Sequence, residues 1–342
     1  MATAYWLAAA TALHTAPQVS QEIAQQAIAL SALVPDVLAR GWQLGRGAAL
    51  YAGIFNSLPR PSTPQSVAIV VSHCQEDLSW LRALPNTRTA VLTICEKCSL
   101  MTDADELRRH FKEVAIIHLP NQAMESLGYA SYLAERRNVA ADVTIFLQGD
   151  PFHHLISKEL LNLVLQSASH GLYTVDFLHL NRMRFLSGGS LCVEEMHQFL
   201  QRASAANDVA ETDFSVVTQD SANYTVVGSY CCSQFVVSRG AIQRQSAQFY
   251  ALLASVLAGG GPQPVMCTQD PAHDSRPRIA ISALMEHLWH VVFGEPAELP
   301  LREHDVRLPL FARVKERYLQ DNPSDADVDY HMLVLPLLGQ EQ

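Results

Sequence analysis

The sequence predicts an α/β fold, in which a mostly parallel, twisted sheet carries helices on both faces. Short apolar runs alternate with segments of helical periodicity between residues 66 and 296, and this alternation is typical of parallel sheets. Several runs stop abruptly at polar residues, as buried strands do when they carry polar groups at their carboxyl ends. The 342 residues are 49% hydrophobic, which is enough for a sizeable core.

The expected elements follow the apolar spacing along the chain. Strands are expected at 67–72, 89–94, 113–119, 143–147 and 224–237, and helices at 18–56, 121–138, 157–169, 190–202, 241–257, 279–293 and 310–318. Three prolines between residues 58 and 64 mark a linker. We therefore expect a helical extension at 1–60, a catalytic core at 66–296, and a tail at 297–342 that packs on the core.

Composition excludes some classes of protein. The net charge of −10 argues against a constitutive nucleic-acid binder, so we expect no DNA partner. The apolar stretch at residues 2–13 lacks the basic start of a signal peptide and is too short to span a bilayer, so no membrane association is expected. Seven irregularly spaced cysteines are interpreted as reduced, in a cytoplasmic protein.

The most informative stretch is 142–154. Its apolar strand stops at Gln148, Gly149 and Asp150, and a proline follows. Ligands of open α/β sheets bind outside the carboxyl ends of the strands. Asp150 is therefore expected in a site, with the alternative that it caps the next helix or a turn.

Two further polar groups are candidates. His73 and Glu76 follow the first strand and would face the same crevice as Asp150, unless the acids at 76 and 77 only begin a helix. Glu286 and His290 share a helix face away from an apolar stripe, so they face either water or a polar pocket.

Common catalytic motifs are absent, and the cysteine pairs are weak signals. No Walker motif, G-x-G-x-x-G, G-x-S-x-G or H-E-x-x-H occurs. The pair Cys95 and Cys98 lacks further ligands for zinc. Cys231 and Cys232 cannot both point the same way on a strand, although one of them would be able to face the site as a nucleophile. We therefore expect no metal ligands.

Four blocks of the chain resemble, in the same order, the signatures of a domain family of unknown function that is abundant in fungi. They lie within residues 66–296, at 70–81, 146–151, 231–239 and 286–294. The family is similar to GT-A glycosyltransferases, in which a D-x-D-like motif holds a metal and a nucleotide diphosphate. Residues 148–150 of this chain are Gln, Gly and Asp, so only the last acidic residue of that motif is present. At 121–125 many relatives have Asn-Val-Gly-Arg-Glu, and this chain lacks the Gly and the Arg, a natural donor to a diphosphate.

The chain also resembles fungal arginine-containing cyclodipeptide synthases. This resemblance implies synthesis of an arginine-containing diketopiperazine in secondary metabolism, with arginyl-tRNA and a second aminoacyl-tRNA as substrates. No cofactor is then expected, and a divalent metal only if the alternative, a glycosyltransferase using a nucleotide sugar, holds. A third alternative is an inactive family member that binds a ligand or partner.

The resemblance also assigns roles to residues. The expected catalytic residues are Asp150, Glu76, His73 and Glu286, where carboxylates suit a guanidinium and a base takes an amine proton. His287 and His290 are alternative bases, and Ser72, Cys231 and Ser233 are alternative nucleophiles. The expected substrate-binding residues are Gln148, Asn121, Gln234, His287 and Cys231.

Overall fold

The computed structural model describes residues 63–98, 104–171, 173–187, 191–205, 226–261, 277–302, 304–305, 307–308 and 312. The expected helix at 18–56 lies outside these residues, as do nearly all of the linker and of the expected helix at 310–318. The chain divides into two compact units. One comprises Val67–Leu155 and Asp176–Pro300, and the other comprises Met1–Ser66, Ile156–Val175 and Leu301–Gln342. The domain boundaries expected from the sequence stay a prediction.

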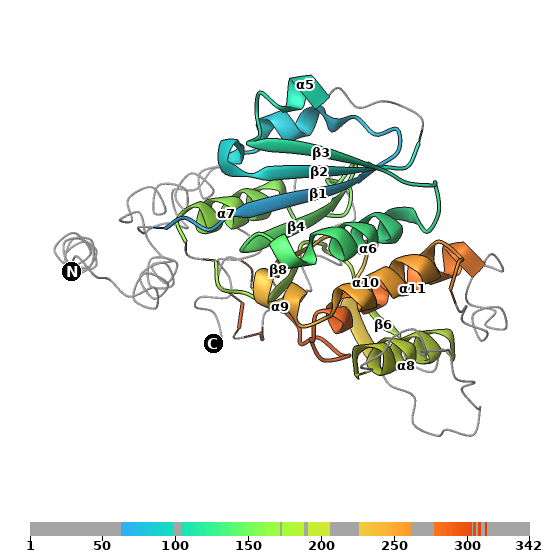
Figure 1. Ribbon diagram of the computed structural model, residues 1–342. Coiled ribbons are helices and arrows are strands. Elements are labelled where there is room, and N and C mark those ends of the chain that lie inside the picture. The colour runs from blue at the N-terminus through green and yellow to red at the C-terminus, as the bar shows by residue number, and fades with distance from the viewer. Residues whose placement is uncertain are drawn as a thin grey trace, which may run out of the picture. The chain divides into compact units, whose positions relative to one another are not determined.

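The larger unit is built on a six-stranded sheet in the order β3-β2-β1-β4-β8-β5 (Figure 1). Its strands are β1 (Val67–His73), β2 (Val91–Glu96), β3 (Glu113–His118), β4 (Val143–Gln148), β5 (Phe177–His179) and β8 (Phe235–Ser238). Strands β1 to β4 are parallel, and β8 alone runs antiparallel, between β4 and β5. The mixed α/β class and the mostly parallel sheet are therefore confirmed.

The central strands form because their sequences are apolar on both faces. All seven residues of β1 are buried, as are the first five of β4, and many of them are β-branched. The register pairs Ser72 with Gln148 and His73 with Glu96. The polar residues that end these strands therefore meet at one edge of the sheet.

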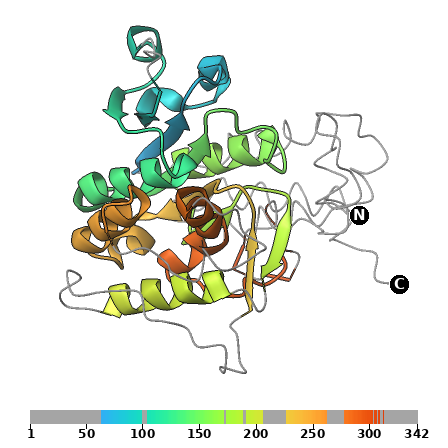
Figure 2. The same cartoon turned by 90° about the vertical axis from the view of Figure 1, so that its right-hand side faces the viewer.

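Helices cover the sheet in layers. Helix α6 (Met124–Arg136) packs on β1 and β2, α10 (Ala247–Leu257) and α11 (Pro277–Val292) pack on α6, and α8 (Leu191–Ala205) packs on α11. Figure 2 shows the orange helices beneath the green α6, with the yellow-green α8 outermost. The short helices of this unit are α5 (Ala104–Leu107), α9 (Arg239–Gln243) and the 3-10 segments Leu78–Ala83, Thr87–Thr89 and Arg137–Val139.

The described part of the smaller unit centres on α7 (Lys158–Ser169), which confirms the helix expected at 157–169. Ser157 caps it, with its side chain accepting from the backbone N–H of Leu160 at 3.1 Å. The side chain of Gln65 is held by the backbone of Tyr173, as donor at 2.7 Å and as acceptor at 3.0 Å.

Two expected elements are wrong in their extent. The strand expected at 224–237 is two strands, because the chain turns at residues 231–234 between β7 (Val227–Tyr230) and β8. Strand β7 pairs with β6 (Arg184–Ser187) in a separate two-stranded sheet. The helix expected at 241–257 is α9 and α10, because Ser246 caps a new helix by accepting from the N–H of Phe249 at 2.9 Å.

The core of the larger unit is an aromatic cluster between α6, α11 and the sheet. Tyr129 lies 5.0 Å from Phe146 and 5.9 Å from Trp289, between ring centroids, and Phe235 lies 5.6 Å from Trp289. All four side chains are fully buried. Pairs of this kind contribute about 0.5–1.5 kcal/mol beyond their buried area, so the cluster fixes α6 and α11 against the strand ends.

The expectation that the cysteines are reduced is wrong. Disulfides join Cys74 to Cys98 and Cys231 to Cys232, and Cys192 is also disulfide-bonded. Among the described cysteines Cys95 is free and buried. In sequence the 231–232 pair resembles part of a strand, whereas the structure places it in a turn where the two sulfurs can meet. None of the described helices is long and apolar enough to cross a bilayer.

Candidate functional site

The candidate site lies at the carboxyl edge of β1, β2 and β4. Glu76 follows β1 and Lys97 follows β2, whereas Gln148 is the last residue of β4 and Asp150 lies just beyond it. Glu125 in the first turn of α6 interacts electrostatically with Lys97 and with the side chain of Gln148, and Glu286 on α11 interacts with Glu125. Parallel strands bring their carboxyl ends to one edge, which is the usual binding edge of such sheets.

Glu76 is held rigidly although it is exposed. Its Oε2 accepts from the backbone N–H groups of Cys74 at 2.7 Å and Gln75 at 3.1 Å. Burial by itself raises the pKa of Glu76, but these N–H groups and the nearby His73 outweigh it and lower the pKa. A Cβ at Gly149 would lie 2.5 Å from Oε2, so the carboxylate requires glycine there.

Lys97 and Glu125 form a buried pair of opposite charges. Lys97 Nζ donates to the backbone carbonyl of Met124. Burial lowers the pKa of Lys97, and the charges of Glu125 and Glu76 oppose that shift. Burial raises the pKa of Glu125, and the side chains of Ser233 and Gln148 and the charge of Lys97 oppose it. Both groups are therefore desolvated and depend on each other for charge compensation.

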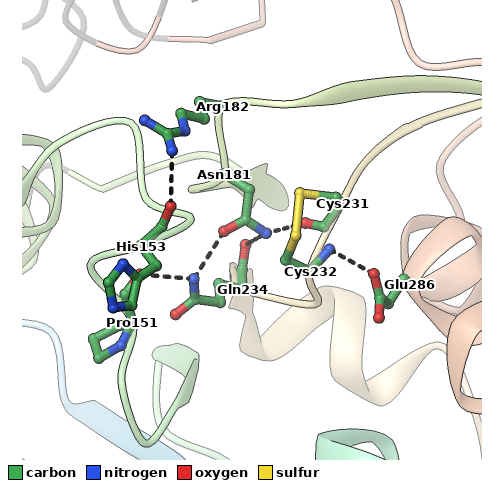
Figure 3. The surroundings of a disulfide bond; sticks show 8 residues. All are labelled: Pro151, His153, Asn181, Arg182, Cys231, Cys232, Gln234 and Glu286. Atoms are coloured by element: carbon green, nitrogen blue, oxygen red, sulfur yellow. Dashed lines mark hydrogen bonds between the residues drawn. A yellow bond between two sulfur atoms is a disulfide. The ribbon is translucent and has the colours of Figure 1, made fainter. Parts of the chain in front are cut away.

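Glu286 is a carboxylate whose surroundings raise its pKa into the range that suits proton transfer. Its Oε2 accepts from the backbone N–H of Cys232 at 3.1 Å (Figure 3). Burial, and then the charge of Glu125, raise the pKa of Glu286 to about 7, although the Cys232 N–H opposes them. A glutamate with this pKa exchanges protons near neutral pH, which an ordinary glutamate does not do.

Tyr129 links the two buried carboxylates electrostatically. Burial raises its pKa well above the ordinary value, and the charges of Glu125 and Glu286 add to the shift. Its hydroxyl and the indole N–H of Trp289 are buried without a hydrogen-bond partner among the described residues. Buried polar groups are normally satisfied, so the unpaired Tyr129 hydroxyl is available as a hydrogen-bond donor within electrostatic reach of the two carboxylates.

The turn between β7 and β8 holds Glu286 in position. Cys232 and Ser233 have φ of 72° and 49°, in the left-handed region that non-glycine residues rarely adopt. Gln234 Nε2 donates to the carbonyl of Pro151 at 3.1 Å and to Asn181 Oδ1 at 2.9 Å (Figure 3). Asn181 Nδ2 in turn donates to the carbonyl of Cys231. This network explains how an irregular backbone keeps one conformation.

The structure brings together only part of the expected site. Gln148 lies beside Glu125, and Gln234 holds the turn. Asp150 is exposed, and its Oδ2 lies 3.1 Å from His153 Nε2. Asn121 is also exposed.

The expected histidines have structural contacts. His73 is buried, with its Nε2 3.0 Å from the carbonyl of Glu76. The half-buried His287 lies with its ring 5.1 Å from that of Phe185. The expectation that His290 is not a core residue is wrong, because it is fully buried and its Nε2 lies 2.8 Å from the carbonyl of Ala297. Glu286 is half-buried, and its carboxylate accepts from the backbone N–H of Cys232, so it is turned toward the turn between β7 and β8.

Glu125 and Lys97 are members of the site that sequence reasoning missed. Lys97 directly follows an apolar strand, and Glu125 opens the helix after another. The same strand-end signal that selects Asp150 was therefore present for both. Burial, which separates them from Asp150, is not visible in the sequence.

A D-x-D-type metal does not fit the residues present. Asp150 Oδ2 lies beside His153 Nε2, and no group of three or more carboxylates in the described part of the chain has its ligand atoms at metal-binding distances. The group that does have such distances is His154, Cys231 and Cys232.

Comparison with known proteins gives a family match and a weak structural likeness. A family model described as "Protein of unknown function (DUF3431)" matches residues 69–307. Mouse xyloside xylosyltransferase 1, in its apo form, is similar with 11% identity and a TM-score of 0.26, covering 70% of this chain and 86% of that one. No curated protein matches.

Proposed function

This chain belongs to the DUF3431 family, and we propose that it is a transferase whose Glu286 takes the proton from a substrate nucleophile. The observation that carries the proposal is geometric. Glu286 is fixed by the Cys232 N–H at the binding edge of a parallel sheet, within electrostatic reach of the buried Glu125. Its pKa of about 7 suits a general base near neutral pH.

We further propose that the group transferred is a glycosyl group and the nucleophile a hydroxyl. The disulfides support this, because disulfides persist in oxidising compartments, where many glycosyltransferases work and aminoacyl-tRNAs are not supplied. The same bonds favour such a compartment over the cytoplasm. Since the carboxylates do not fit a D-x-D metal, the proposal includes no metal-dependent step.

One observation favours a second candidate, the synthesis of an arginine-containing cyclodipeptide. The candidate site contains more carboxylates than cations. Its carboxylates are Glu76, Glu125 and Glu286, and the buried cation that interacts with the first two is Lys97. An excess of carboxylates suits a guanidinium, which binds them in a two-pronged geometry, and is less suited to a diphosphate. Glu286 would then take the proton from an amine instead of a hydroxyl.

The test uses the purified full chain with a panel of nucleotide sugars and hydroxyl acceptors. Nucleoside diphosphate release and the glycosylated product are measured for wild type, Glu286→Gln and the control Glu113→Gln, an exposed glutamate at the far end of β3. We expect turnover by wild type and the control, and a loss of about 10²–10⁴-fold in Glu286→Gln.

The second candidate is tested in parallel with arginyl-tRNA and a mixture of aminoacyl-tRNAs. A diketopiperazine formed without any nucleoside diphosphate release would replace the glycosyl proposal by the second candidate. Equal turnover by Glu286→Gln and wild type would contradict the role of Glu286 under either reading.

A further inference from the structure

The turn between β7 and β8 carries a second, unassigned set of ligand atoms. We propose that reduction of the Cys231–Cys232 disulfide converts this turn into a binding site for a soft divalent ion such as Zn²⁺, with His154 as the third ligand. The proposal rests on the positions of these three side chains and is independent of the transferase proposal.

The three ligand atoms are already close together. One nitrogen of His154 and the two sulfurs lie within 4.8 Å of one another. Zinc with bonds of about 2.3 Å to sulfur and tetrahedral angles holds two sulfurs roughly 3.8 Å apart. Once the S–S bond is broken, rotation of the two cysteine side chains brings the sulfurs to this separation. Rotation of His154 then brings its nitrogen, which lies within 4.8 Å of both sulfurs, into a third position of the tetrahedron.

The backbone around the pair is held by contacts that do not involve sulfur. Asn181 Nδ2 donates to the carbonyl of Cys231, and the N–H of Cys232 donates to Glu286. The N–H of Cys231 donates to the carbonyl of Met183 at 2.9 Å. These bonds remain available when the disulfide opens, so the ligands stay close together.

The chemistry balances with a dithiol as the named reductant. The dithiol gives two electrons and two protons to the disulfide, which yields two thiols and an oxidised, cyclic disulfide. Zn²⁺ then binds as the two thiols release their two protons, since the thiolate is the metal ligand. Three protein ligands leave a fourth position for water or a substrate atom.

Exposure makes the pair accessible to a reductant. Cys232 and His154 are half-buried, whereas Cys231 is buried, so a small dithiol reaches the pair through Cys232. The free Cys95 is a poor competitor, because burial raises the pKa of its thiol to about 12 and keeps it protonated.

The experiment measures zinc affinity of the full chain by competition with a chromogenic chelator, before and after reduction and removal of the reductant. We expect one additional zinc per chain in the reduced protein. Cys231→Ser removes this zinc, whereas Cys74→Ser, which breaks the other described disulfide of the larger unit, keeps it. Loss of an outer-shell partner alone costs about 10–100-fold in metal affinity, so His154→Ala weakens binding at least that much.

Cobalt(II) gives a second readout that needs no variant. Reduced wild type should show thiolate-to-cobalt charge-transfer absorption that the oxidised protein lacks. The proposal is overturned if oxidised and reduced protein bind zinc equally, if Cys231→Ser retains the additional zinc, or if the cobalt spectrum shows no thiolate ligation.

Discussion

Two of the predicted catalytic carboxylates, Asp150 after β4 and Glu286 on α11, differ in their surroundings. Asp150 projects into solvent, and its partner His153 is also exposed. Glu286 accepts from the backbone N–H of Cys232, and burial with the neighbouring Glu125 raises its pKa to about 7. The sequence predicts a catalytic role for both residues. A position at the binding edge therefore does not by itself desolvate a carboxylate, and it is burial that raises the pKa of Glu286.

The largest effect is expected on the transferase rate, when each of the two carboxylates is replaced by its amide in a separate variant. Glu286→Gln should lower the transferase rate about 10²–10⁴-fold, the usual contribution of a general base. Asp150→Asn should lower it less than about tenfold, since an exposed ion pair contributes about 0–1 kcal/mol. The measurement is kcat/KM for both variants with the substrate found in the panel assay. A larger loss of kcat/KM in Asp150→Asn than in Glu286→Gln would contradict the assignment of Glu286 as the base.

Gly149→Ala tests the close packing beside the exposed carboxylate of Glu76. The new Cβ would lie 2.5 Å from Glu76 Oε2, so either the carboxylate or the end of β4 must move. We expect a loss of about 1–3 kcal/mol in the free energy of unfolding, as for other overpacked sites.

Gly240→Ala is the matched control for denaturant unfolding of this variant. It lies in α9, where the nearest atom to a new Cβ is Ser238 Oγ at 3.6 Å. Equal free energies of unfolding for the two variants would show that position 149 tolerates a side chain beside Glu76.

Glu125→Gln tests whether the charge of Glu125 contributes to the raised pKa of Glu286. The charge of Glu125 contributes to the raised pKa of Glu286, so its removal should lower that pKa toward the ordinary value. The rate falls when the base becomes protonated, and the acid side of the pH–rate profile should therefore move to lower pH. An unchanged profile would mean that burial alone sets the pKa of Glu286.

The last expected effect is on how the stability of the protein changes with pH. The pKa of Glu286 is raised from 4.5 to about 7 on folding, so between these values the folded chain binds more protons than the unfolded one. The free energy of unfolding contributed by this group therefore falls as pH rises through that window. Glu286→Gln, which still accepts from Cys232, should raise Tm relative to wild type more at pH 8 than at pH 4.5. A pH-independent difference would contradict the shift.

The fold was predictable because β1 to β4 and α6 have long, consistent apolar patterns. The turn at residues 231–234 was not, because two of its non-glycine residues, Cys232 and Ser233, adopt positive φ and the turn joins two sheets. The strand-end rule correctly identified Gln148 and the residues after β1 as edge groups. The rule could not show that Asp150 is exposed and Glu125 is buried, because burial depends on the packing of α6 and α11, which no local sequence pattern encodes.

Glu286 acts as the base only if its carboxylate is desolvated and titrates near neutral pH. The direct measurement is a pH titration of the full chain labelled with ¹³C-carboxyl glutamate, followed by NMR, with Glu286→Gln identifying the signal. We predict an apparent pKa of about 7 for this signal, with a coupled second step from Glu125. A signal that titrates near 4.5, as in an exposed glutamate, would contradict the claim and remove Glu286 as the base.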